Sequence, residues 1–140
     1  MTKAYISISY NKRQELNDEL QSIIKTLREF HIKPFVFVDN FKFSSDQEKE
    51  MMAQALLSID DCDLLIAETS DKGIGIGVEV GYAKAKGKPV IYMRNKNADH
   101  STTVSGLSDS QIIYDDVKDL KEQLAIVLSE IINFQNKKVE

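Results

Sequence analysis

A glycine-rich stretch in the middle of the chain holds the carboxylate best placed for chemistry. Residues 73–83 read Gly-Ile-Gly-Ile-Gly-Val-Glu-Val-Gly-Tyr-Ala, so Glu79 follows three alternating glycines, Gly73, Gly75 and Gly77. An apolar run precedes them and helical character follows, which predicts a strand-to-helix turn where a ligand can approach the backbone closely. We expect Glu79 in the first helical turn, where free N–H groups favour its ionised form.

An ionised carboxylate beside such a turn has the properties of a catalytic nucleophile. A simpler interpretation is that Glu79 only stabilises the helix dipole, by roughly a few tenths of a kcal/mol. In that case the glycines serve only close packing, since Gly77 and Gly81 lie four residues apart on one helix face. The residues alone leave both interpretations open.

Apolar segments of strand type alternate along the chain with segments of helical periodicity, and these elements must position Glu79. We expect strands at residues 4–9, 35–38, 63–68, 88–93 and 111–114. We expect a first helix at residues 12–30 and a second that begins at a capping box of Ser45 and Glu48 and ends at Asp60. A third helix follows the glycines, a short helical piece lies within residues 94–110, and a last helix runs from Leu120 to Ile132. Met52, Leu56 and Ile59 are the predicted buried face of the second helix.

This alternation predicts an α/β fold, because parallel strands need crossover helices. We expect a single-domain three-layer sandwich with a five-stranded parallel sheet in the flavodoxin-like order 2-1-3-4-5. The domain covers residues 1–134, and residues 135–140 form a charged tail that we expect to fray.

Ligands of such sheets bind beyond the carboxyl ends of the strands, at the point where the strand order reverses. Here that point lies between the first and third strands. It brings Ser7, Ser9 and Tyr10 next to the segment 69–79, so the fold places Glu79 where a ligand is expected.

Composition excludes several classes of function. The 140 residues are 42% hydrophobic and 29% charged, with a formal net charge of −4, which gives no electrostatic basis for binding nucleic acid or a membrane. Cys62 is the only cysteine, and His31 and His100 lack metal-ligand spacing. We therefore expect a cytoplasmic protein. A carboxylate nucleophile does the chemistry by itself, so no metal or organic cofactor is implied.

Two other polar groups allow two interpretations each. Asp39, at the end of the second strand, is either a ligand of a ribose hydroxyl or a cap of the following segment. The cluster Asn11, Lys12 and Arg13 either meets a phosphate or forms a solvated first helical turn.

The segments 63–68, 75–83 and 87–91 together resemble the nucleoside 2-deoxyribosyltransferase family, which includes the small 2'-deoxynucleoside 5'-monophosphate N-hydrolases. The resemblance implies an enzyme that cleaves or transfers across the N-glycosidic bond of a nucleoside or nucleoside 5'-monophosphate. Glu79 matches the family's nucleophile, which forms a covalent glycosyl ester, and Tyr5 matches a tyrosine close to it. Ser101 matches a serine that reaches the phosphate site of a neighbouring subunit, so the resemblance also implies a homodimer or larger assembly.

Three positions depart from the family pattern. Ala55 stands where the family has an aspartate that assists departure of the base, Gly73 replaces a serine, and of the first-strand turn only Ser9 is retained. An alternative is therefore a catalytically weak or inactive nucleotide-binding module. The predicted substrate contacts are Ser7, Ser9, Gly73, Gly75, Gly77 and Ser101.

A second resemblance is to Toll/interleukin-receptor domains, some of which cleave NAD at its N-glycosidic bond. It rests on residues 5–10, on the strand that ends at Asp39 and on a glutamate after the third strand. The Trp- and Cys-rich surroundings usual for that glutamate are absent from this sequence.

Overall fold

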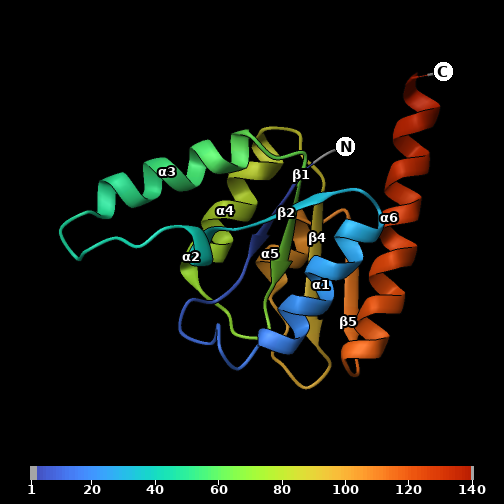
Figure 1. Cartoon of the computed structure of the whole chain (residues 1–140), viewed down its shortest axis with the longest axis horizontal. Coiled ribbons are helices and arrows are strands. Elements are labelled where there is room, and N and C mark those ends of the chain that lie inside the picture. Colours follow the sequence, from blue (N-terminus) through green and yellow to red (C-terminus); the bar gives the residue numbers. More distant parts are fainter. Residues whose placement is uncertain (1–2, 140) are drawn as a thin grey trace.

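The computed structural model describes residues 3–139, which form one parallel five-stranded sheet flanked by helices (Figure 1). The strand order is β2-β1-β3-β4-β5, which confirms the predicted order 2-1-3-4-5. The strands are β1 Lys3–Ser7, β2 Lys33–Val36, β3 Leu64–Glu68, β4 Val90–Asn95 and β5 Ser110–Tyr114.

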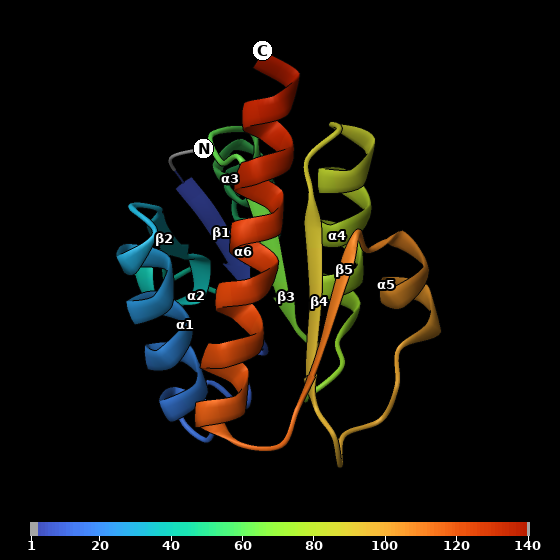
Figure 2. The ribbon, with the colours of Figure 1, turned by 90° about the vertical axis from the view of Figure 1, so that its right-hand side faces the viewer.

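Helices cover both faces of the sheet, as the alternating pattern predicts. Figure 2 shows α1 (Asn17–Glu29) and α6 (Val117–Val139) on one face, and α4 (Ile74–Ala85) with α5 (Thr102–Leu107) on the other. The helix α3 (Glu48–Asp60) packs beside α4. A four-residue helix, α2 (Phe37–Asn40), follows β2 directly.

Alternating side chains divide the core into two layers. Ala4, Ile6 and Ile66 belong to the cluster under α1 and α6, whereas Tyr5 and Leu65 belong to the cluster under α4. All five residues of β3 are buried, as expected for a central strand covered on both faces. Tyr5 therefore faces the same layer as the glycine-rich helix.

The register of β1 and β3 creates the crevice above the sheet. Ser7 pairs with Ala67, so both strands end at the same level. The chain then diverges to α1 on one face and to α4 on the other. Parallel sheets bind ligands at such a point.

Several element boundaries differ from the predictions. The strand β1 ends at Ser7 rather than Ser9, and α1 begins at Asn17 because residues 10–16 form turns. Ser45 does not cap α3; instead the side-chain oxygen of Gln47 accepts hydrogen bonds from the backbone N–H and hydroxyl of Ser44, each at 2.9 Å.

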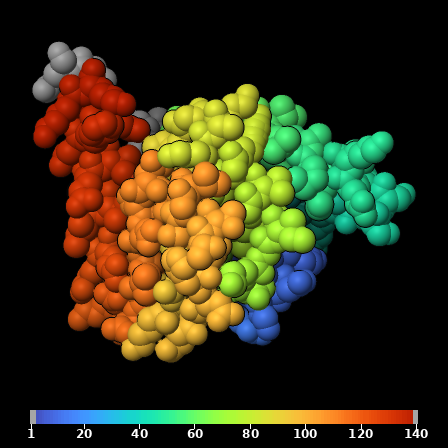
Figure 3. Space-filling model, turned by 180° about the vertical axis from the view of Figure 1, so that it is seen from behind, coloured from blue at the N-terminus to red at the C-terminus, as the bar shows by residue number. Residues whose placement is uncertain are grey.

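The buried face of α3 and the end of α6 also differ from the predictions. Ala55, Ser58 and Ile59 are the buried residues of α3, while Met52 and Leu56 are only partly buried. The helix α6 runs through residues 135–139, where the sequence suggests a frayed tail, and its end stands clear of the body in Figure 3. Within residues 3–139, no helix has the length and apolar character needed to cross a membrane.

The glycine-rich segment is helical from Ile74 onwards, which corrects the predicted turn. Gly75 and Gly77 lie in the first turns of α4, and Glu79 is in the second turn rather than the first. A Cβ atom added at Gly73, Gly75, Gly77 or Gly81 would meet no atom within 4 Å. Close packing inside this chain therefore does not explain these glycines.

Candidate active site

Glu79 lines a hollow of about 290 Å³ at the carboxyl end of the sheet. The loop after β1 contributes Ser9 and Tyr10, and the glycines of α4 lie beside Glu79. Phe37 from α2 and Ala55 from α3 form an apolar wall. The hollow thus joins a carboxylate, glycine backbone and apolar surface from four separate elements.

Glu79 is partly buried, and its carboxyl group is only half paired. Oγ of Ser7 donates a hydrogen bond to Oε1 at 3.2 Å, while Oε2 is buried and has no hydrogen-bond partner among residues 3–139. Burial raises the pKa of Glu79, and the nearby Ser7 and Tyr5 hydroxyls oppose that shift. The prediction that the helix end favours the ionised form is therefore wrong, because desolvation outweighs a helix terminus more than one turn away.

Tyr5 lies under Glu79 and is completely buried. Its ring packs against Phe35 at 5.8 Å and Phe37 at 6.2 Å between centroids. Burial, and then the neighbouring Glu79 carboxylate, raise the pKa of Tyr5, so its hydroxyl stays protonated and able to donate. That hydroxyl and Oε2 of Glu79 are both buried, and the hydroxyl is close enough to the carboxyl group to lower the pKa of Glu79.

Ser9 and Asp71 form a second polar pair in the same hollow. Oγ of Ser9 donates to Oδ2 of Asp71 at 2.5 Å and accepts from the backbone N–H of Lys12 at 3.3 Å. Sequence reasoning missed Asp71 as a site residue. The only signal was its position between β3 and the glycines, inside the segment that the fold places at the crevice.

An aromatic cluster extends the apolar wall. Phe37 packs tilted against Phe41 with the ring centroids 5.3 Å apart, and Phe41 stacks on Phe43 with the centroids 6.0 Å apart. They line a second hollow of about 410 Å³, which shares Tyr10 and Phe37 with the first. The Phe-rich run 35–43 signalled this surface, but sequence analysis assigned it no function.

Ser101 lies apart from Glu79 within the chain. Its Oγ caps α5 by accepting from the N–H of Val104 at 3.3 Å, and it lines a different hollow of about 350 Å³. Gly73 and Lys72 border both hollows. Ser7, Ser9, Gly73 and Gly75 thus gather around Glu79, Gly77 faces the Ser101 hollow, and Ser101 does not meet Glu79 in one chain.

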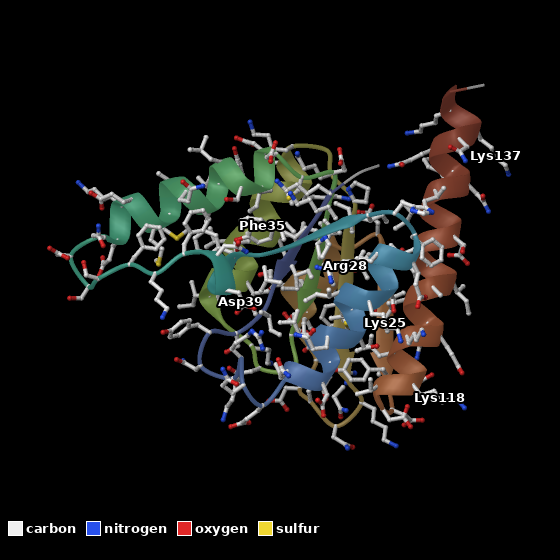
Figure 4. All side chains as sticks on the ribbon, viewed as in Figure 1. Lys25, Arg28, Phe35, Asp39, Lys118 and Lys137 are labelled. Atoms are coloured by element: carbon white, nitrogen blue, oxygen red, sulfur yellow. The ribbon has the colours of Figure 1, made fainter. Side chains whose placement is uncertain are left out.

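Asp39 and Arg13, which each have two interpretations in the sequence, form an ion pair with each other. Nε and Nη2 of Arg13 donate to Oδ1 and Oδ2 of Asp39 at 2.8 and 2.7 Å, and Figure 4 shows Asp39 on α2. The Asp39 carboxylate raises the pKa of Arg13. The pair fastens the loop after β1 onto α2, and the roles of these residues toward a ribose or a phosphate stay predictions.

The described residues offer no group of three or more histidine, cysteine, aspartate or glutamate side chains that would hold a metal ion. The polar groups that line the hollow are two carboxylates, the Ser9 and Tyr10 hydroxyls, and the side chains of Asn11 and Lys72. A buried carboxylate beside two hydroxyls can attack an electrophilic carbon or exchange a proton with a ligand.

An α/β sheet with a hollow at its strand-order reversal belongs to a class of folds that bind small molecules at this position. Comparison with known proteins gives the family. The model described as nucleoside 2-deoxyribosyltransferase matches residues 5–128, and the chain belongs to this family. Its members are enzymes that cleave or transfer across the N-glycosidic bond of nucleosides or nucleotides.

Individual relatives agree with this assignment. The chain is 27% identical over 114 residues to a putative 2'-deoxynucleoside 5'-phosphate N-hydrolase 1 of Syntrophotalea carbinolica, covering 79% of this chain and 78% of the relative. The structure of a CMP N-glycosidase of Clostridium botulinum is 25% identical, with TM-score 0.66, 89% of this chain and 99% of that chain covered.

A third comparison supports the fold alone. The 2-deoxyribosyltransferase of Bacillus psychrosaccharolyticus has a TM-score of 0.68 at 17% identity, with 86% of this chain and 90% of that chain covered. The similarity therefore extends over nearly the whole sheet and its helices.

Proposed function

We propose that Glu79 is the nucleophile in cleavage of the N-glycosidic bond of a nucleoside or nucleoside 5'-monophosphate. The observation that carries this proposal is Oε2 of Glu79, a buried carboxylate oxygen that lacks a partner and borders an open hollow. Leaving such an oxygen unpaired is costly unless a ligand uses it.

The reaction follows the two-step logic of retaining glycosidases. The Glu79 carboxylate attacks the anomeric carbon, the bond to the base breaks, and a glycosyl ester forms. Water then resolves the ester in a hydrolase, whereas a second base resolves it in a transferase. Ser7 holds Oε1 at 3.2 Å, which leaves Oε2 for attack, and the Tyr5 hydroxyl lies close enough to the carboxyl group to lower its pKa.

The surrounding residues suit the rest of a nucleotide. Ser9 and the exposed backbone beside Gly73 and Gly75 provide polar contacts for the sugar, and Phe37 provides a flat apolar surface for a base. The relatives named for a deoxynucleoside 5'-phosphate and for CMP support a monophosphate as the substrate to test first.

We also propose that the active unit is a homodimer. Ser101 and Gly77 border a separate hollow, and Ile74 beside them is 88% exposed although it is apolar. In a dimer that buries this surface, Ser101 would be positioned to serve the site of the partner subunit.

The test is release of free base. Purified protein is incubated with nucleosides, nucleoside 5'-monophosphates and NAD, with Glu79→Gln in parallel. Base release by wild type, with a loss of about 10³-fold or more in the variant, supports nucleophilic catalysis. A trapped adduct on Glu79, found by mass spectrometry of a quenched reaction, would establish the ester.

A binding module is the second candidate, because Ala55 contributes a methyl group to the hollow where the family has a carboxylate. In that case no substrate releases base, yet a nucleotide raises the melting temperature. Base release from NAD alone would instead favour the NAD glycohydrolase interpretation.

A further inference from the structure

A second carboxylate faces the hollow of Glu79. Among the described residues that line it, Asp71 and Glu79 are the two acids, and Asp71 comes from the loop between β3 and α4. Ala55, from α3, lines the same hollow and has no group that can exchange a proton. The hollow therefore holds a pair of acids although α3 provides neither.

One oxygen of Asp71 is fixed and the other is free. Ser9 donates to Oδ2 at 2.5 Å, and since Ser9 Oγ also accepts from the N–H of Lys12, its own proton is directed to Asp71. Oδ1 makes no hydrogen bond within residues 3–139. This arrangement orients the carboxyl group and leaves one oxygen available to a ligand.

Cleavage of the N-glycosidic bond requires more than a nucleophile. As the bond breaks, its electron pair moves to the base, and most bases leave slowly unless a proton arrives on the ring. Glu79 is occupied with the anomeric carbon in the proposed mechanism, so a different group must supply that proton.

We infer that Asp71 is the general acid of the reaction, an inference that rests on the proposed function. In the first step the Glu79 oxygen bonds to the anomeric carbon, the bond to the base breaks, and the proton of the Asp71 carboxylic acid moves to the base. The products are the glycosyl ester, a neutral base and the Asp71 carboxylate.

The second step returns both groups to their starting states. The Asp71 carboxylate takes a proton from water as the water oxygen bonds to the anomeric carbon. The ester bond to Glu79 breaks, which releases the sugar and restores the Glu79 carboxylate and the Asp71 acid. With a second base as acceptor, Asp71 takes the proton from that base instead.

The test compares two leaving groups in the Asp71→Asn variant. A guanine nucleotide needs protonation of its base, whereas the N7-methylated guanine nucleotide already carries a cationic base and does not. We expect the variant to lose about 10²-fold or more in kcat on the first and less than about 5-fold on the second. If wild type accepts only pyrimidines, uracil and 5-fluorouracil nucleotides form the pair, because fluorouracil leaves more readily as an anion.

Two further variants complete the design. Asp18→Asn, on the exposed surface of α1, is the matched control and should leave both rates unchanged. Ser9→Ala keeps the Asp71 carboxyl group but removes its hydrogen-bond donor, and should lower the rate more on the base that needs protonation than on the methylated base. It also provides the readout if Asp71→Asn fails to fold, which melting curves detect.

The outcomes separate this inference from the proposed function. Base release by wild type with unchanged rates in Asp71→Asn overturns the role of Asp71 and leaves Glu79 chemistry intact. An equal loss on both leaving groups also overturns it, because the residue would then only position the substrate. Absence of base release by wild type refutes the proposed function, and the inference with it.

Discussion

At the scale of single residues, the burial of Glu79 lowers the free energy of unfolding at neutral pH, and replacement of the residue should reveal this. Because the pKa of Glu79 is raised in the fold, ionisation is harder there than in the unfolded chain. The stabilising contribution of the neutral acid is present at pH 4 and below, and is lost as the pH rises through the folded pKa. Glu79→Gln keeps an oxygen for Ser7 and never ionises.

We therefore predict that Glu79→Gln is more stable than wild type at pH 7, by about 1 kcal/mol, and that the difference vanishes near pH 4. Denaturant unfolding between pH 4 and pH 8 measures it. The exposed Glu122→Gln is the control and should show no such trend. A destabilised Glu79→Gln at pH 7 would contradict a buried, unpaired carboxylate.

Loss of the Tyr5 hydroxyl should lower the rate of base release but change the free energy of unfolding little. The hydroxyl is buried beside the Glu79 carboxyl group, whose pKa it lowers, so Tyr5→Phe removes one donor near the nucleophile and keeps the ring packed on Phe35 and Phe37. We predict a change in unfolding free energy of less than about 1 kcal/mol, with a loss of about 10-fold or more in base release. A loss of stability above about 2 kcal/mol would show that the hydroxyl has a structural partner.

At the scale of elements, a second buried carboxylate ties β3 to β5 across β4. Glu68 is completely buried, accepts from the Tyr114 hydroxyl at 2.5 Å, and also accepts from the backbone N–H of Ser70. Burial raises the pKa of Glu68, while these donors oppose the shift. This pair lies in the layer of α1 and α6, away from the Glu79 hollow.

Tyr114→Phe should therefore destabilise the fold by about 1–3 kcal/mol at pH 8 and by less at pH 4. The destabilisation is larger at pH 8 because loss of the donor raises the pKa of Glu68 further. Ionisation of Glu68 at high pH then lowers the free energy of unfolding more than in wild type. Unfolding at the two pH values checks the prediction. Tyr10→Phe, on an exposed loop, is the matched control, and an equal loss at both pH values would contradict the role of the Glu68 charge.

Element order was predictable because it depends on periodicity alone, whereas the site depends on contacts that no periodicity encodes. The buried run of β3 and the alternation of β1 are visible in sequence, and so is the crevice between them. The start of α4 was placed too late because Gly75 and Gly77 are poor helix formers, and here tertiary structure overrides their propensity. Glu79 consequently lies one turn further into the helix than expected.

The partners of the site residues were beyond sequence reasoning for the same reason. Asp71 resembles any acidic loop residue until Ser9, 62 positions away, is seen to hold it. Arg13 and Asp39 each have a functional interpretation in isolation, and only their mutual distance shows that they pair. Ala55 was identified as a departure, but only the structure shows that its methyl group borders the hollow.

At the scale of the whole molecule, the proposed homodimer depends on the surface around the start of α4. Ile74 is 88% exposed and lines one hollow together with Ser101, the residue that caps α5, and Val78 of the same helix is 46% exposed. Open space at the neighbouring glycines would let a partner subunit approach the helix backbone closely. The same face would then bind the partner and complete the partner's phosphate site.

Ile74→Glu tests this surface without harming the fold, because an acid at the first position of α4 suits the helix dipole. We predict that wild type elutes with twice the mass of one chain in size exclusion with light scattering, and that the variant elutes as a monomer with at least about 10-fold lower kcat/KM for a monophosphate. Ile126→Glu, which replaces an exposed apolar residue on α6, should remain dimeric and active. Ser101→Ala should remain dimeric but raise KM for the monophosphate more than for the nucleoside. A fully active monomeric Ile74→Glu would show that each chain is complete in itself.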